Sequence, residues 1–325
     1  MRRRLLSLLP SLGLAALLPP LLSPAAQAQP AFPDHPITMI VAYAAGGGTD
    51  TAARTLARSM EKGLGQTVVV VNRPGAAGEI GWAELARSKP DGYTIGFINT
   101  PTIVTVPIER QARFQLEDFV PIANIVDDPG GIWVLPDSPW RSLKELVEAA
   151  KKEPGTIGYG TTGIGSDDHL AMLALERQTG AQFLHIPFAG SSQVRTALFS
   201  KNLPVAVVNM GEGIADARQG LVRPLAQLGT RRWEAMPDVP TAREQGFDVV
   251  EGSMRGVAAP AGVPQPVLER LAKAVHSAVD DPDFRQMATQ QSLPLRFLGP
   301  DAFKTELLAL REHYAKLWAM HPWKE

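Results

Sequence analysis

The strongest constraint on the fold is an alternation of short β-branched runs with amphipathic helical stretches. Residues 37–43 read as a strand, a glycine-rich turn follows at 44–48, and Thr49-Asp50 opens a helix whose apolar residues recur at helical spacing. The pattern then predicts a strand at 67–72, a helix at 81–88 and a strand at 93–98. This βαβαβ order is typical of an α/β fold with largely parallel sheets.

The middle of the chain repeats this order of elements. Strands are predicted at 131–135, 157–159, 183–186 and 205–208, and helices at 142–152, 167–178 and 193–199. The strand at 157–159 runs into a second glycine-rich turn at 160–166, and Gly180 ends the helix that follows that turn. We therefore expect two α/β lobes, each with a glycine-rich turn between a strand and a helix.

The first 28 residues have the features of a secretory signal peptide. Three arginines at 2–4 precede an apolar run at 5–22, and Ala26-Gln27-Ala28 is a small-residue cleavage signal. A retained membrane anchor or a twin-arginine signal is the alternative, but Pro10 and Pro19-Pro20 interrupt the apolar run. We expect cleavage after Ala28 and a location in the periplasm.

Removing residues 1–28 deletes three arginines and no acidic residue, so the net charge changes from −1 to −4. No Lys/Arg cluster is present to neutralise phosphates, which disfavours nucleic acid and anionic membrane surfaces as partners. The chain has no cysteine, and therefore no disulfide, no thiolate ligand and no thiol nucleophile. We expect a monomer that needs no cofactor.

The two glycine-rich turns are the predicted binding region. The first amides of a helix lack partners within the helix and carry the positive end of its dipole, and glycine lets a ligand approach the backbone. Hydroxyl groups at Thr49, Thr161, Thr162 and Ser166 add donors without charge. The combination suits a carboxylate. The alternative is that both turns only redirect the chain and that Thr49 and Ser166 are ordinary helix caps.

Motifs for catalysis and for nucleotide binding are absent from the sequence. The first turn lacks the lysine of a P-loop, and neither turn has the spacing G-x-G-x-x-G. The six histidines show no H-E-x-x-H spacing, which disfavours zinc, and no G-x-S-x-G nucleophile elbow occurs. The sequence therefore predicts no catalytic residue and no metal site.

Several ordered segments resemble one known family over nearly the whole chain after residue 28. They are PITMIVAYAAGGGTD at 36–50, AR at 53–54, LGQ at 64–66, VNRPGAAG at 71–78, KPDGYT at 89–94, YGTTG at 159–163, HL at 169–170, MPDVPT at 236–241 and APAG at 259–262. On these residues the chain resembles the Bug-type solute receptors of tripartite tricarboxylate transporters.

The resemblance implies a type II periplasmic binding protein fold, the Venus flytrap, that captures a small organic acid and delivers it to membrane permease subunits. Crossings between lobes are expected near Pro129-Gly130 and at 252–255. The first lobe then combines 29–130 with 254–325, including helices at 267–279 and 302–318, and the second lobe is 131–253. An orphan sensor that presents its solute to a signalling partner is the first alternative, and an enzyme on the same scaffold is the second.

In the family, backbone amides, hydroxyls and ordered waters hold the ligand carboxylate, rather than a buried arginine. Asp50 could instead be a helix cap, and His169 could orient the second turn. The loop Ala189-Gly190-Ser191 is expected to reach the same cleft. Carried onto this sequence, the predicted ligand contacts are Tyr43, Ala45, Gly46, Thr49, Asp50, Asn99, Thr100, Thr161, Thr162, Gly165, Ser166, His169, Ala189 and Asn209.

Departures from the family pattern bear on the ligand. Ala189 stands where the family often has Lys or Arg, so we expect no basic group that could balance a polycarboxylate. Asp167 and Asp168 stand where small or neutral residues are usual, and the segment 203–208 lacks a common acidic residue. An acid facing the cleft would repel a second ligand carboxylate by about 1 to 4 kcal/mol. We therefore expect a monocarboxylate, a weakly charged dicarboxylate, an aromatic or cyclic acid, or an amide-like compound rather than citrate.

Overall fold

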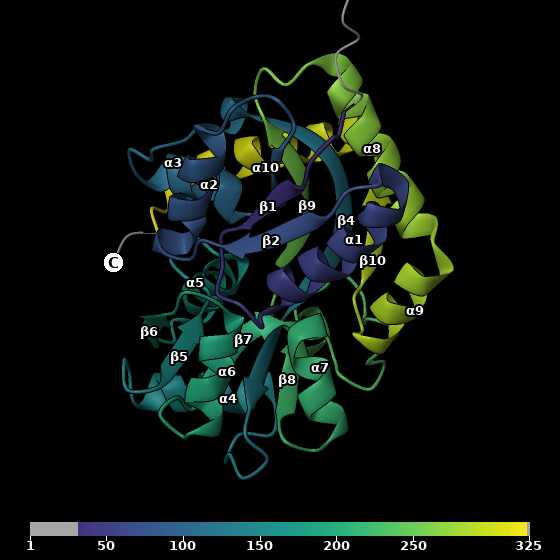
Figure 1. The fold of residues 1–325 in the computed structure, drawn as a ribbon. Helices are drawn as coiled ribbons and strands as arrows, with labels where there is room; N and C mark the ends of the chain where they lie inside the picture. The colour runs from purple at the N-terminus through teal and green to yellow at the C-terminus, as the bar shows by residue number, and fades with distance from the viewer. Residues whose placement is uncertain (1–31, 324–325) are drawn as a thin grey trace, which may run out of the picture. The chain divides into compact units, whose positions relative to one another are not determined.

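The computed structural model describes residues 32–323, so the predicted signal peptide lies outside the described residues. None of the helices in this range combines the length and apolar composition that a bilayer crossing needs. The chain forms a single path of paired strands in the order β2-β1-β3-β9-β4-β7-β5-β6, with β8 and β10 also paired to β4 (Figure 1). The two α/β regions therefore meet along β4.

The first sheet contains parallel strands β1 (Ile37–Val41), β2 (Val68–Asn72) and β3 (Thr94–Asn99). Antiparallel strands β9 (Gly252–Pro260), β4 (Phe119–Val134) and β10 (Leu295–Leu298) complete it. The helices of this part are α1 (Gly48–Leu64), α2 (Glu79–Ala86), α3 (Thr102–Glu109), α8 (Gln265–Asp280), α9 (Pro282–Gln290) and α10 (Pro300–Met320).

The second sheet is built on parallel strands β5 (Gly158–Thr161), β6 (Leu184–Pro187) and β7 (Val205–Asn209). The last part of β4 and β8 (Arg223–Gln227) run antiparallel to their neighbours. The helices here are α4 (Leu143–Lys152), α5 (Asp167–Thr179), α6 (Ser191–Phe199) and α7 (Met210–Arg218). The expected parallel pairing is thus found around β1 and around β5, and both sheets are mixed because β4 and β9 run against them.

Strand β4 is much longer than the strand expected at 131–135. Its first part pairs with β9 through Pro129↔Gly252, and from Gly130 onward it pairs with β7. The Asp127-Asp128-Pro129-Gly130 run favours a turn in the sequence. In the structure the backbone stays extended there, because β7, β8 and β9 supply hydrogen-bond partners on both sides.

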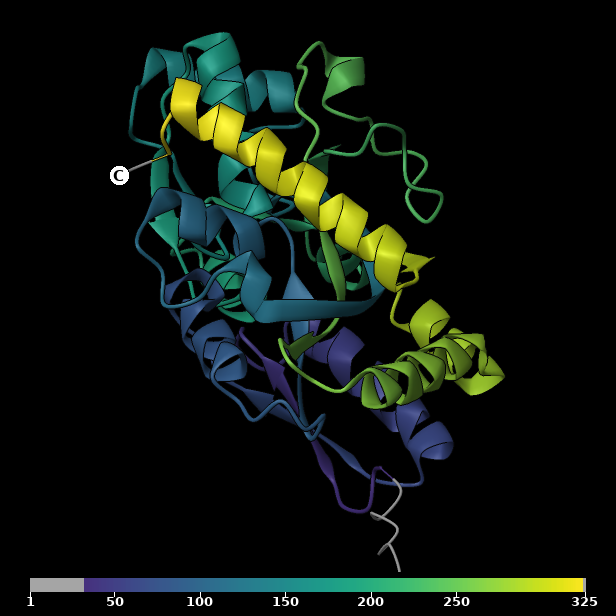
Figure 2. The same cartoon turned by 90° about the horizontal axis from the view of Figure 1, so that it is seen from above.

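The hydrophobic cores follow the sheets. The largest cluster surrounds the first sheet and includes the buried residues Leu271, Val275 and Leu307 of the C-terminal helices, together with Trp323. Alternate residues of β7 enter two smaller clusters on opposite faces of the second sheet. Helix α10 packs along α3 and β4 (Figure 2), so the C-terminal segment returns to the first sheet.

Candidate functional site

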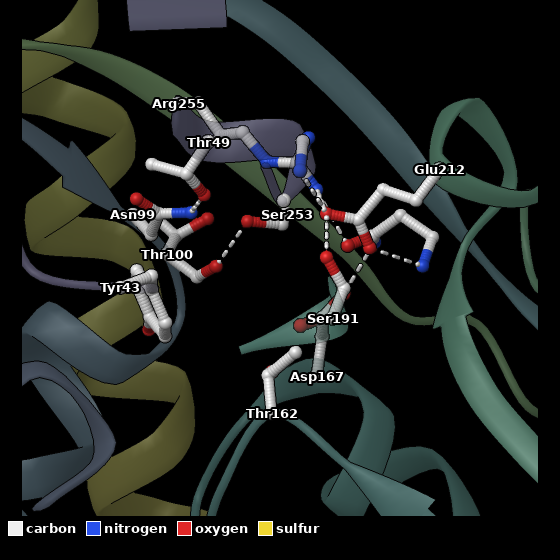
Figure 3. A pocket seen from close by; sticks show the side chains of 13 residues that line it. Tyr43, Thr49, Asn99, Thr100, Thr162, Asp167, Ser191, Glu212, Ser253 and Arg255 are labelled. Carbon is white, nitrogen blue, oxygen red and sulfur yellow. Dashed lines mark hydrogen bonds and ion pairs between the residues drawn. The ribbon is translucent and has the colours of Figure 1, made fainter. Parts of the chain in front are cut away.

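A small cavity of about 20 Å³ lies where strands of both sheets end. The carboxyl ends of parallel strands are the usual ligand position in such folds. In Figure 3, Tyr43, Thr49 and Asn99 lie on one side of this cavity, and Ser191 and Glu212 lie on the other. The lining residues are Tyr43, Gly47, Gly48, Thr49, Asn99, Thr100, Thr162, Asp167, Ser191, Asn209, Glu212, Ser253 and Arg255.

A larger hollow of about 820 Å³ lies along 228–234 and α10. Its lining includes Asp127, Pro129, Glu251 and Tyr314, and neither glycine-rich turn contributes to it. The smaller cavity is therefore the candidate site, because the polar strand ends and the first helix N-terminus converge there.

The first turn joins β1 to α1 and is held by its own side chains. Gly46 has φ +80°, which favours glycine, and its N–H donates to Asp50 Oδ2 at 3.0 Å. Asp50 also accepts hydrogen bonds from Arg54 and Asn72, so it fixes the turn and does not line the cavity. Thr49 Oγ1 accepts a hydrogen bond of 2.7 Å from Asn99 Nδ2, which ties the helix N-terminus to the end of β3.

The second turn joins β5 to α5 and is also held internally. Ser166 is the N-cap of α5, and its Oγ accepts from the His169 N–H at 3.2 Å. Gly165 N–H donates to His169 Nδ1 at 3.2 Å. Burial lowers the pKa of His169 to about 3, so the ring is neutral and can accept that hydrogen bond. Thr162 donates from its backbone N–H and from its hydroxyl to Asp168 Oδ2.

A buried ionic cluster forms the third side of the cavity. Arg255, on β9, is 1% exposed and donates from Nη2 to Asn209 Oδ1 at 2.7 Å and to Glu212 Oε1 at 3.2 Å. Its Nη1 lies 3.4 Å from Asp128 Oδ2. Glu212 Oε1 also accepts from Gly48 N–H at 3.1 Å and from Ser191 Oγ at 3.0 Å. Glu212 therefore links the N-terminus of α1 to the end of β7.

The carboxylates of this cluster have shifted pKa values. Burial raises the pKa of Asp128 to about 7 and that of Asp167 to about 6, against the attraction of Arg255. Burial together with the charge of Asp167 raises the pKa of Asp168. Burial alone would lower the pKa of Arg255, but Glu212 and Asp128 raise it overall. The cavity wall is thus acidic, with one compensated cation.

The structure places the predicted contacts in two groups. Tyr43, Thr49, Asn99, Thr100, Thr162 and Asn209 line the cavity. The remaining predicted residues build the turns behind the lining or stand beside it. They are Ala45, Gly46, Asp50, Thr161, Gly165, Ser166, His169 and Ala189. Ala189 nonetheless connects the two sheets, because its carbonyl oxygen accepts from Ala44 N–H at 3.2 Å.

One basic residue that the sequence analysis did not anticipate, Arg255, lines the cavity, and it is already paired with Asp128 and Glu212. The basic group comes from β9 and not from the loop around Ala189. Glu212 and Ser253 are also lining residues that sequence reasoning missed. A signal existed for Glu212, because it stands three residues after Asn209 in a capping box, where the side chain faces the helix N-terminus.

Comparison with known proteins adds the following similarities. The family model described as "Tripartite tricarboxylate transporter family receptor", TctC, matches residues 52–299. The "UPF0065 protein in gbd 5'region" of Cupriavidus necator is 34% identical over 85% of this chain and 82% of its own length. The structure of the periplasmic binding protein BugD is 32% identical, with a TM-score of 0.85 over 90% of this chain and 99% of that one.

A third similar structure contains a ligand. MatC from Rhodopseudomonas palustris with bound malate is 25% identical, with a TM-score of 0.82 over 88% of this chain and 99% of that one. These likenesses confirm the α/β, two-lobed binding protein fold expected from the sequence.

Proposed function

The chain belongs to the tripartite tricarboxylate transporter receptor family, TctC, and from this membership we propose that it captures a small organic acid in the periplasm and delivers it to the membrane permease of such a transporter. Members of this family are periplasmic solute-binding receptors. The observation that carries the proposal is the convergence of the first turn, the second turn and β9 on one polar cavity. We further propose that the mature chain begins after Ala28.

The proposed lobes are 29–130 with 254–325, and 131–253, with β4 and β9 passing between them. A cavity of about 20 Å³ has room for about one water molecule, whereas ligand pockets usually measure about 300 Å³ or more. The described arrangement is therefore a closed one, and a ligand enters only when the lobes separate. A ligand that contacts both sides then shifts the population toward closure.

The proposed ligand is a monocarboxylate or a weakly charged dicarboxylate rather than citrate. Support comes from Asp167 and Glu212, which both line the cavity. Each additional ligand carboxylate at several ångströms from Asp167 is disfavoured by about 1 to 4 kcal/mol, depending on screening. The malate bound to the related MatC protein is a small carboxylate of the size class proposed here.

The site is tested with the variant Asn99→Ala and its matched control Asn202→Ala, which changes an exposed asparagine. Mass spectrometry of the protein purified from its host identifies the bound acid, and calorimetry then measures the affinity of both variants for that acid. We expect Asn99→Ala to weaken binding about tenfold, because it removes a buried polar contact, and Asn202→Ala to leave it unchanged. Equal affinity of the two variants would place the ligand elsewhere.

The transport role has a separate test. The permease subunits, reconstituted in vesicles, should accumulate the identified acid only when the receptor is present, and the receptor should return the acid chemically unchanged. Uptake that is independent of the receptor would contradict delivery, while leaving ligand capture intact.

A further inference from the structure

Several amides of the two glycine-rich turns already donate to acceptors of this chain. Gly48 N–H, at the start of α1, donates to Glu212, and Gly46 N–H donates to Asp50. In the second turn, Thr162 N–H donates to Asp168. Three side-chain carboxylates therefore bind amides at the start of α1 or in the turns before α1 and α5, where a ligand anion could otherwise bind.

The charge that remains at the cavity is negative. Arg255 is the cation of the wall, and both Glu212 and Asp128 already lie within 3.4 Å of its guanidinium. Asp167 accepts a hydrogen bond of 2.7 Å from Asn209 Nδ2, but forms no ion pair with any residue in 32–323. Burial raises the pKa of Asp167 to about 6, and the hydrogen bond from Asn209 and the attraction of Arg255 oppose that shift.

Two buried side chains of the wall have polar atoms without hydrogen-bond partners in the described chain. Asn99 is 5% exposed, and its Oδ1 has no donor. The Nε of Arg255 has no hydrogen-bond partner in residues 32–323, and its Nη1 has none beyond the ion pair with Asp128 at 3.4 Å. Buried polar atoms are rarely left unpaired, so these atoms indicate ligand groups of matching chemistry. Asn99 Oδ1 can accept from a donor of the ligand, and the Nε–H of Arg255 can donate to one ligand carboxylate. Figure 3 shows Asn99 and Arg255 among the side chains that line the cavity.

We propose that the ligand is an amino-acid-like zwitterion, with a protonated nitrogen facing Asp167 and Asn99 and a single carboxylate facing Arg255. This inference rests on the proposed receptor function and specifies the ligand class of the same cavity. A protonated nitrogen pairs with the carboxylate of Asp167 and supplies a donor, and the one carboxylate meets the Nε–H of Arg255, which has no partner in the described chain. A second carboxylate would instead meet Asp167, and the amides of Gly46, Gly48 and Thr162 already donate to other carboxylates.

The experiment compares ligands of equal length and different charge by calorimetry on the mature protein. The four-carbon set is succinate, butyrate, 4-aminobutyrate and 1,4-diaminobutane, and matched three-, five- and six-carbon sets cover the reach of the cleft. α-Amino acids of the same lengths complete the panel. We expect the tightest binder to be an amino acid that binds at least about tenfold more tightly than the dicarboxylate of its length, a difference of about 1.4 kcal/mol.

Two variants test the role of Asp167. Asp167→Asn should reduce the preference for the amino acid over the dicarboxylate by about tenfold or more. The control Asp137→Asn removes an exposed carboxylate that pairs with Lys201, and it should leave the preference unchanged. The wild-type ranking decides the inference even if Asp167→Asn fails to fold.

The outcomes separate the inference from the function on which it rests. A dicarboxylate as the tightest wild-type ligand overturns the zwitterion and leaves the receptor function in place. A diamine as the tightest ligand overturns the assignment of a carboxylate to Arg255. An absence of binding across the panel and to the acid recovered by mass spectrometry overturns the receptor function, and the inference with it.

Discussion

Replacing Arg255 with methionine removes the cation that lies between Asp128 and Glu212. The guanidinium is 1% exposed, with Nη2 3.2 Å from Glu212 Oε1 and Nη1 3.4 Å from Asp128 Oδ2. Methionine keeps most of the apolar length of the arginine side chain, so the substitution changes mainly the charge and the hydrogen bonds. The variant therefore reports how strongly this cation stabilises the buried carboxylates.

The expected cost is about 3 to 5 kcal/mol above neutral pH, the usual effect of removing one partner of a buried ion pair. Its pH dependence follows from the carboxyl groups. The pKa of Asp128 is already about 7 in the folded protein, above the ordinary value of 3.8, and the loss of Arg255 raises it further. Between the ordinary pKa of 3.8 in the unfolded chain and the raised pKa of Asp128 in the folded chain, the folded state binds more protons than the unfolded state. Stability therefore falls as the pH rises through this range. At pH 5 the group is protonated, and the cost should be smaller by about 1 to 2 kcal/mol.

Urea unfolding at pH 5 and pH 7.5, followed by tryptophan fluorescence, measures both values. Arg58→Met, which changes an exposed arginine of α1, is the matched control and should alter stability by less than about 0.5 kcal/mol at either pH. A loss below about 1 kcal/mol for Arg255→Met, or an equal loss at the two pH values, would refute the assignment of Arg255 as the compensating charge.

Two further predictions concern packing. Gly256→Ala places a Cβ 2.3 Å from the Ala123 carbonyl oxygen, which belongs to the backbone and cannot move aside. We therefore expect the free energy of unfolding to fall by about 1 to 3 kcal/mol. The control Gly299→Ala meets nothing within 4 Å and should cost less than about 1 kcal/mol. Thermal unfolding of the pair checks this, and equal melting temperatures would contradict it. Leu271→Ala, on the buried face of α8, should cost about 2 to 5 kcal/mol. The control Leu308→Ala, whose side chain is 41% exposed, should cost about 0.5 kcal/mol or less. Urea midpoints that agree within error would show that α8 is not packed as described.

Local sequence signals were sufficient to predict the elements that position the site. The turn at 44–48 and the turn at 160–166 both lie between a strand and a helix, because glycines at the end of β-branched runs favour that geometry. The roles of Asp50 and Ser166 could also be read locally, since each bonds an amide within four residues of itself. Such short-range contacts depend on few neighbours.

The electrostatics of the cavity could not be read in this way. Glu212 reaches Gly48 across 164 positions of sequence, and Arg255 reaches Asn209 across 46. Whether such side chains meet depends on how β4 and β9 bring the two sheets together, which no local pattern encodes. The family resemblance implied that the turn amides hold the ligand, and here the amides of Gly46, Gly48 and Thr162 bind the chain's own carboxylates. The departure at Asp167 was visible in the sequence, but its position in the wall was not.

The bond between Glu212 and Gly48 constrains how a ligand can promote closure. It joins the start of α1 to the start of α7, so the closed arrangement already contains one charge-assisted contact without a ligand. A ligand carboxylate that displaced Glu212 from this amide would exchange one anion for another and leave Glu212 buried without that donor, so it would gain little. A ligand that leaves this bond intact and pairs with Asp167 adds a contact that the ligand-free closed state lacks. Because only such differential contacts shift the equilibrium between open and closed lobes, the acidic wall favours closure around a cationic nitrogen.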